Sequence, residues 1–202
     1  MLEHAIQFFQ AGGWVMYPLL AMSVVSLTLI FERTIFWVLG PQRKGARRLG
    51  VYLSSIASAP DDEIRNRARA DSTLEARLVA LSFSSENRSE PILIGHIESI
   101  RPSIERFAPT LGTIIAAAPL LGILGTVTGI IQSFDLLGEA SSVSDPTVVA
   151  GGIAEALYTT AFGLCIALIT LFPHVYFKSR ADRALGRLEI LAGAIASHSF
   201  KN

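Results

Sequence analysis

The distribution of basic residues constrains the fold of this chain more than any other feature. The chain holds 17 Lys and Arg residues among 202, yet none precedes Arg33 and none lies between Phe107 and Lys178. The regions without them are apolar, and a helix of about 20 residues crosses a hydrocarbon core about 30 Å thick. Residues 12–39, 108–137 and 148–177 are long enough to do so. The sequence therefore predicts an all-α membrane protein with three transmembrane helices.

The same charges predict an orientation, because basic residues concentrate in the cytoplasmic loops of membrane proteins. We expect the loop 40–107 and the tail 178–202 to lie in the cytoplasm, and the N-terminus and the loop 138–147 to lie outside. This is an N-out, C-in arrangement. A cleaved signal peptide is the alternative for the first span, but a basic n-region is missing and the apolar run is longer than usual.

Helices are also expected outside the bilayer. Residues 1–11 place apolar side chains at helical spacing, which fits a short amphipathic segment on the outer surface, although a frayed terminus fits equally well. The basic run QRKGARR at 42–48 could attract anionic lipid. Pro60 and the acids that follow it mark a helix start, and that helix should run to about Ser82. The tail 178–202 is expected to be a cytoplasmic helix.

An apolar stripe at helical spacing connects the cytoplasmic loop to the second span. Its members are Leu93, Ile97, Ile100, Ile104, Phe107 and Leu111. The stripe predicts one helix from about Pro91 to about Leu137, about 70 Å long at the rise of an α-helix. We expect bends at Pro102 and Pro109, because proline lacks the N–H that the preceding turn requires. Long helices should therefore extend from the membrane into the cytoplasm.

Small residues occupy one face of the second and third spans. In the stretch 111–134 they are Gly122, Thr126, Gly129 and Ser133, and in the third span they are Gly152, Ala156, Thr159, Gly163, Ala167 and Thr170. Such faces let membrane helices approach closely. The loop 138–147 is short and turn-forming, so the two spans should form an antiparallel hairpin. The first span is bulkier, with Ser23, Ser26 and Thr28 as its few polar residues, and is expected to face lipid.

Two threonines and one glutamate are the candidate functional residues. Counting from the outer ends of their spans places Thr126 and Thr160 at a similar depth. Their hydroxyls could instead bond only to their own helices, in which case the small faces serve helix contact alone. Glu155 lies near the outer hydrocarbon boundary, where a carboxylate generally faces protein or water, although solvation by lipid head groups is the alternative.

Neither the second nor the third span carries a titratable group near its middle. Asp135 and Glu155 are peripheral at the outer side and His174 is near the inner edge. If protons move through these spans, the carboxylate that carries them must come from another protein. The single Cys165 permits neither a disulfide nor a cysteine metal site within one chain, and we expect no metal and no cofactor.

The strings TIIAAAPLLGILGTVTGIIQSF and GIAEALYTTAFGLCIALITLFPHVYF closely resemble the two signature helices of the ExbB/TolQ/MotA proton-channel family. The three-span layout is similar to the ExbB/TolQ-like branch, because a MotA-like chain would show four spans. The resemblance implies a homo-pentamer in the bacterial inner membrane, whose second and third spans line a pore around an ExbD- or TolR-like single-span partner. That partner would supply the titrating aspartate, and a TonB- or TolA-like envelope protein would receive the force.

The resemblance also implies roles for individual residues. Thr126 and Thr160 match pore-lining threonines, and Glu155 matches an outer-pore glutamate. Pro119 and Pro173 match helix-bending prolines. Independently of the resemblance, Gly122, Gly125, Gly129 and Gly163 are expected to serve helix packing. Asp135 and His174 depart from the family pattern, which leaves the routes of proton uptake and release open.

The expected function is that of a proton-channel or motor subunit that converts the proton motive force into mechanical work on the cell envelope. The alternative is a structural helical membrane oligomer or scaffold without proton flux. An enzyme is not expected, because the sequence holds no nucleophile–base set, metal cluster or phosphate loop, and GILGTVTG lies inside an apolar span. No nucleic-acid partner is expected either.

Overall fold

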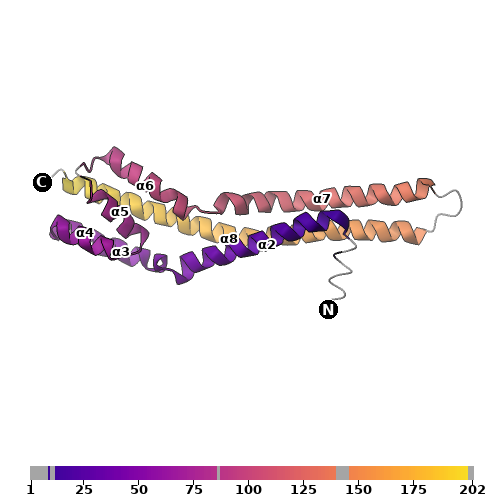
Figure 1. Cartoon of the computed structure of the whole chain (residues 1–202), viewed down its shortest axis with the longest axis horizontal. Helices are drawn as coiled ribbons and strands as arrows, with labels where there is room; N and C mark the ends of the chain where they lie inside the picture. The colour runs from indigo at the N-terminus through magenta and orange to yellow at the C-terminus, as the bar shows by residue number, and fades with distance from the viewer. Residues whose placement is uncertain (1–8, 10–11, 86, 140–145, 200–202) are drawn as a thin grey trace. The chain divides into compact units, whose positions relative to one another are not determined.

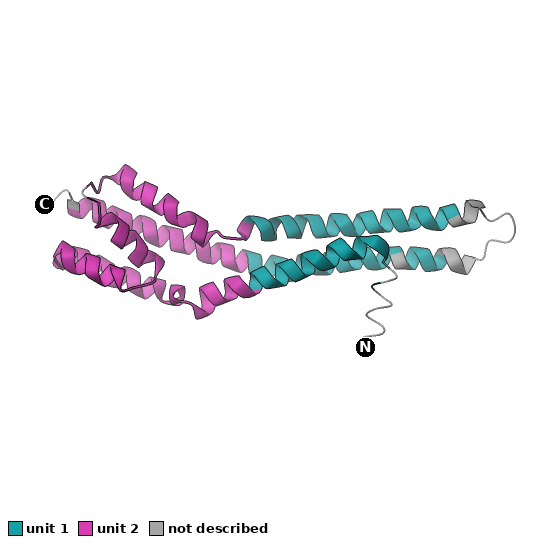
Figure 2. Cartoon of the chain, viewed as in Figure 1, with its two compact units in different colours: residues 1–30, 109–174 teal, residues 31–108, 175–202 magenta. Residues whose placement is uncertain are grey.

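Every regular element in the described part of the chain is a helix (Figure 1). The computed structural model describes residues 9, 12–85, 87–139 and 146–199, apart from the side chains of 136–139, 146–149, 155 and 199. The segment 1–11, except Phe9, and most of the loop 138–147 therefore lie outside the described residues. The chain divides into two compact units, one of residues 1–30 and 109–174 and one of residues 31–108 and 175–202 (Figure 2).

Three helical stretches of the described residues are long and apolar enough to cross a membrane: Gly13–Leu39, Ala108–Asp135 and Ala150–His198. The first comprises η1 (Gly13–Val15), α2 (Met16–Thr34) and η2 (Ile35–Leu39). The second belongs to α7 (Ala108–Glu139) and the third to α8 (Pro146–Ser199). The prediction of an all-α chain with three membrane-length helices is confirmed. The expected third span and tail helix are one unbroken helix, α8.

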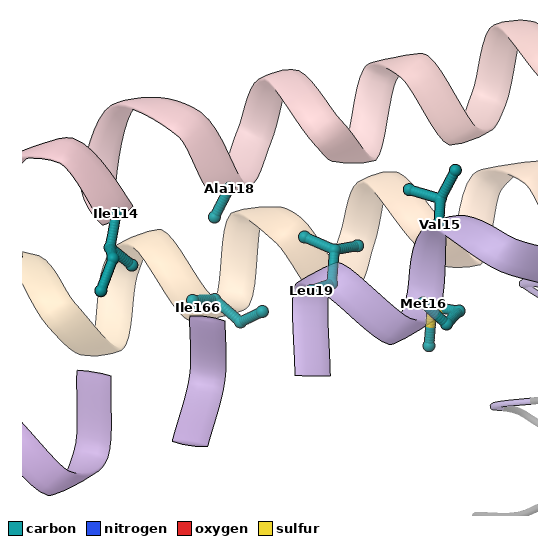
Figure 3. Close-up of a cluster of buried hydrophobic side chains, with 6 residues drawn as sticks. All are labelled: Val15, Met16, Leu19, Ile114, Ala118 and Ile166. Atoms are coloured by element: carbon teal, nitrogen blue, oxygen red, sulfur yellow. The ribbon is translucent and has the colours of Figure 1, made fainter. Parts of the chain in front are cut away.

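The first unit is held by contacts among η1, α2, α7 and α8. Its core consists of six buried apolar side chains from these elements, Val15, Met16, Leu19, Ile114, Ala118 and Ile166 (Figure 3). Tyr17, Leu20 and Val24 on α2 are exposed. One face of the first span is therefore buried against the other two spans, and the opposite face is exposed, as a span that faces lipid on one side requires.

The glycines of α7 and α8 lie at the contact between these helices. A Cβ atom added to Gly122 would come within 2.8 Å of Thr160 Cα, and one added to Gly129 would come within 2.8 Å of Ala156 Cβ. Gly125 lies against the side chain of Thr159, and Gly163 lies against the carbonyl of Ala118. As the residue numbers of the contacting positions increase along α7, those of their partners decrease along α8, so the two helices are antiparallel.

The second unit is a bundle of shorter helices and the C-terminal part of α8. The shorter helices are η3 (Pro41–Lys44), α3 (Gly45–Ser58), α4 (Asp61–Arg69), α5 (Leu74–Ser82) and α6 (Glu90–Ile104). On α6 the members of the predicted stripe, Leu93, Ile97, Ile100 and Ile104, are all buried. A buried ion pair, Arg187 Nε to Glu75 Oε1 at 2.7 Å, joins α8 to α5.

The single helix expected from Pro91 to Leu137 is two helices in the structure. α6 ends at Ile104, α7 begins at Ala108, and Phe107 between them has a left-handed φ of 66°. Pro109 explains the break, because in a continuous helix it would have no N–H for the carbonyl of Glu105 and its ring would clash with that carbonyl. In the structure Pro109 sits in the first turn of α7, where that N–H is not needed. Pro102 is accommodated inside α6.

The helix expected to reach Ser82 without interruption is also two helices. α4 ends at Arg69, and the carboxylate of Asp71 accepts the N–H of Thr73 at 3.1 Å. The Thr73 hydroxyl then accepts the N–H of Ala76 at 3.3 Å and caps α5. Short polar side chains of this kind compete with helical hydrogen bonds and start new helices. The helical spacing of apolar residues continues across both helices, so it does not predict the turn between them.

Candidate functional site

Three threonine hydroxyls meet at one backbone carbonyl between α7 and α8. The Gly122 carbonyl accepts hydrogen bonds from Thr126 Oγ1 at 3.1 Å, from Thr159 Oγ1 at 3.1 Å and from Thr160 Oγ1 at 2.9 Å. Thr126 belongs to the same helix as Gly122, and the other two belong to α8. We call Thr126, Thr159 and Thr160 with the carbonyls of Gly122 and Ala156 the hydroxyl cluster.

The second carbonyl of the cluster comes from α8. Ala156 O accepts from Thr159 Oγ1 at 2.7 Å and from Thr126 Oγ1 at 3.3 Å. The hydroxyls of Thr126 and Thr160 also hydrogen-bond to each other. The two threonines that counting places at similar depth therefore lie side by side.

The cluster offers more acceptors than it has protons. Each threonine hydroxyl donates one hydrogen and can accept two, so Thr126 cannot bond to Gly122 O, Ala156 O and Thr160 Oγ1 at the same time. Rotation of a hydroxyl can exchange one acceptor for another without movement of the backbone. The arrangement can therefore redistribute hydrogen bonds across the contact between the helices.

Sequence spacing explains how the cluster forms. A threonine in a membrane helix commonly bonds to the carbonyl four residues earlier, which is how Thr126 reaches Gly122. Because Gly122 has no side chain, α8 approaches closely enough for Thr159 and Thr160 to reach the same carbonyl. The bonds within one helix and the bonds between helices, which the sequence left as alternatives, both occur.

The other candidate residues lie at several places. The backbone of Glu155 lies in α8, one turn from Thr159, but its side chain lies outside the described residues. Asp135 is exposed near the end of α7, and His174 is half-buried beside Gly112 of α7. Pro119 and Pro173 sit inside α7 and α8, which continue through them.

The chemistry of the hydroxyl cluster is limited to positioning hydrogen bonds. Threonine hydroxyls do not titrate near neutral pH, so the cluster cannot itself hold an exchangeable proton as an acid. Within the described residues, no group of three or more His, Cys, Asp or Glu side chains could hold a metal ion.

Sequence reasoning missed a second hydroxyl pair in the first unit. Ser26 Oγ of α2 and Thr170 Oγ1 of α8 lie 2.6 Å apart, with the two residues 2% and 0% exposed. Thr170 also donates to Ile166 O at 2.7 Å. In the sequence, Ser26 is one of few polar residues in the first span, and Thr170 lies on the face of small residues in the third span. The sequence does not show that these two faces contact each other.

These features define a class of protein. Three membrane-length helices, a glycine-mediated hairpin and a buried hydroxyl cluster make this a multi-pass helical membrane protein with a polar site between its spans. Residues 65–190 match the sequence model of the MotA/TolQ/ExbB proton channel family, which is more than half of the chain. The chain therefore belongs to the MotA/TolQ/ExbB proton channel family.

Individual relatives agree with this assignment. Two ExbB-like biopolymer transport proteins of Synechocystis, numbered 1 and 3, are 36% and 32% identical to the chain. The alignment with the first covers 81% of this chain and 66% of the relative, and the alignment with the other covers 92% and 90%. The Tol-Pal system protein TolQ of Pseudomonas aeruginosa is 29% identical, over 86% of this chain and 80% of its own length.

Proposed function

We propose that the chain is the channel subunit of a machine that converts the proton motive force into mechanical work on the cell envelope. It assembles as a homo-pentamer in the bacterial inner membrane, with its N-terminus outside and its C-terminus in the cytoplasm. α7 and α8 surround a single-span partner of the ExbD/TolR kind, and a TonB- or TolA-like protein receives the force. The chain acts as a channel subunit and not as an enzyme.

The hydroxyl cluster is the observation that carries this proposal. It lies in the helices that match a proton-channel family, and it can rearrange hydrogen bonds without a titrating group of its own. A partner aspartate facing Thr126 and Thr160 would find hydroxyl donors when ionised and acceptors when protonated. Glu155 and Asp135 would then lie toward the outer end of the path.

The test compares proton flux in proteoliposomes that contain the chain and its partner. Thr160→Val removes the hydroxyl at nearly constant volume, and we expect flux to fall about tenfold, equivalent to about 1.4 kcal/mol for a lost hydrogen bond to a charged group. Thr160→Ser keeps the hydroxyl and should retain flux within about twofold. Thr126→Val and Glu155→Ala should each lower flux as well.

Thr128→Val is the matched control on the same helix. The Thr128 hydroxyl bonds only to carbonyls of its own helix in the described contacts, Leu124 O at 3.0 Å and Gly125 O at 3.1 Å. Wild-type flux in Thr128→Val with low flux in Thr160→Val supports the proposal, provided that both variants assemble with the partner. Wild-type flux in Thr126→Val, Thr160→Val and Glu155→Ala would assign the polar face to helix contact alone, as in a scaffold.

A further inference from the structure

A polar pocket directly follows the first membrane-length stretch and takes no part in the channel described above. Its volume is about 310 Å³, and Leu39, Lys44, Arg48 and Ser72 are among the residues that line it. One wall is the chain from Leu39 through η3 into α3, and the other is the 70–73 turn between α4 and α5. The whole pocket lies inside the second unit.

Gln42 holds the two walls together. Its side chain is buried, its Oε1 accepts the N–H of Leu74 at 3.2 Å, and its Nε2 donates to Ser72 O at 3.4 Å. These bonds, both made by groups of the chain itself, fix η3 against the turn. The pocket is therefore a preformed part of the fold.

The charges that the pocket leaves available are positive. Among the described residues, Asp71 is the one carboxylate that lines the pocket. It forms an ion pair with Arg48 at 3.2 Å and accepts hydrogen bonds from the hydroxyl of Tyr52 and the N–H of Thr73, both at 3.1 Å. Lys44 is exposed, and no carboxylate in the described part of the chain lies within ion-pair distance of it. The sequence holds no Asp or Glu between Glu32 and Asp61 that could offset this charge.

The pocket also touches apolar surface at the end of the membrane-length stretch. Leu39, which lines it, is the last residue of the membrane-length stretch and is 74% exposed. A ligand that satisfies both parts needs an anionic group for Lys44 and Arg48 and a hydrocarbon portion for Leu39. Lys and Arg near a membrane surface gain about 1 kcal/mol each from anionic lipid.

We propose that this pocket binds the phosphate group of an anionic phospholipid. Lys44 and the free edge of Arg48 contact the phosphate, Ser72 donates a hydroxyl hydrogen bond, and Leu39 lies against the start of an acyl chain. The site would anchor the end of the first span to one leaflet. It does not depend on proton flux, so it can fail or succeed independently of the proposed channel function.

The test measures lipid binding to the purified full-length chain in dodecyl maltoside by native mass spectrometry. Dioleoylphosphatidylglycerol should bind at least about fivefold more tightly than dioleoylphosphatidylcholine, which is about 1 kcal/mol. Lys44→Gln should weaken phosphatidylglycerol binding about fivefold. Arg43→Gln removes the same charge from the neighbouring residue, which does not line the pocket, and should change binding by less than about twofold.

A second pair of variants adds charge instead of removing it. Ser72→Glu places a carboxylate in the pocket, and Asn66→Glu places one on the exposed surface of α4. Ser72→Glu should weaken phosphatidylglycerol binding more than Asn66→Glu does, while the unfolding midpoints of both stay near the wild-type value. If Lys44→Gln and Arg43→Gln, or Ser72→Glu and Asn66→Glu, weaken phosphatidylglycerol binding equally, the lipid binds a diffuse basic surface. Either result would overturn the proposed binding in the pocket.

Two further outcomes would also overturn the lipid proposal. If millimolar inorganic phosphate displaces phosphatidylglycerol completely, the pocket is a site for free anions and the acyl contact contributes nothing. If polyglutamate binds the wild type but not Lys44→Gln, and phosphatidylglycerol does not distinguish them, the pocket is a site for an acidic protein partner. Selective loss of phosphatidylglycerol in Lys44→Gln and Ser72→Glu supports the proposal.

Discussion

At the scale of single residues, small side chains decide what the apolar helices can do. The gap that Gly122 leaves lets two α8 threonines share its carbonyl with Thr126. In a bilayer, apolar side chains gain little by leaving lipid, so helix contact depends on close approach and on hydrogen bonds. Glycine supplies the first and threonine the second, and both act at the same place on α7.

Gly129→Ala should weaken the contact between α7 and α8. The new methyl group would lie 2.8 Å from Ala156 Cβ, so the helices must separate, at a cost of about 1–3 kcal/mol. Gly151→Ala is the control, because no atom lies within 4 Å of a Cβ added there, and alanine should be neutral or stabilising by up to about 1 kcal/mol. Thermal unfolding in detergent measures both. Equal midpoints for the two variants would contradict the close contact at Gly129.

Tyr52 should make the stability of the second unit fall at alkaline pH. Burial raises the pKa of the Tyr52 hydroxyl above its usual range, and the neighbouring Asp71 carboxylate raises this pKa further. The folded state therefore keeps a proton that the unfolded state loses near pH 10, so the stability is complete below about pH 10 and declines as the pH rises above it.

The measurement is the unfolding midpoint of the full chain between pH 8 and pH 11. Tyr52→Phe removes the titrating group, while Asp71 keeps its contacts with Arg48 and the Thr73 N–H. The variant should start less stable than the wild type at pH 8 and lose less stability on the way to pH 11. Parallel pH profiles for the two proteins would show that Tyr52 is not the source of the decline.

At the scale of elements, the ends of helices were harder to predict than their faces. The apolar stripe on α6 continues in phase to Leu111, although the helix itself stops at Ile104. Contacts between arginine side chains and the Phe107 ring stabilise the end of α6. Arg33 Cζ lies 5.6 Å and Arg106 Cζ 4.6 Å from the centroid of the Phe107 ring, and Arg33 also donates to Ser103 O at 3.3 Å.

Phe107→Gly should leave the chain more stable than Phe107→Ala. Both variants lose the ring contacts, but only glycine adopts the left-handed backbone of residue 107 without strain, a difference of about 1–2 kcal/mol. Gly95 in α6 is the control, because its surroundings are open and alanine there should be the better residue by about 0.5–1 kcal/mol. Thermal unfolding of the three variants tests this, and the opposite order at residue 107 would contradict the helix break.

At the scale of the whole molecule, one long helix belongs to both units. α8 contributes Thr159, Thr160 and Thr170 to the first unit and Arg187 to the second, with no interruption in between. Arg187 reaches the fully buried Glu75, and removal of one partner from such a pair costs about 3–5 kcal/mol. The helix that carries the hydroxyl cluster is therefore anchored at its other end by a buried charge.

The N-out, C-in orientation can be measured in cells. In a Cys165→Ser background, we introduce one cysteine by Ser141→Cys, between the second and third spans, or by Asn66→Cys on α4. A membrane-impermeant maleimide should label Ser141→Cys in spheroplasts and should label Asn66→Cys only after the membrane is opened, because the positive-inside rule predicts that the basic loop is cytoplasmic. Labelling of Asn66→Cys in closed spheroplasts would reverse the orientation.

The sequence alone determined the three membrane-length helices, the small faces and the pairing of Thr126 with Thr160. These follow from charge exclusion and from helical spacing, which are local properties of the chain. Tertiary structure decided which faces meet, and so it decided that Thr159 joins the cluster, that Ser26 meets Thr170 and that α2 buries one side. It also decided the breaks before α5 and α7, because a capping hydroxyl or a left-handed residue depends on neighbours that the periodicity of the sequence does not reveal.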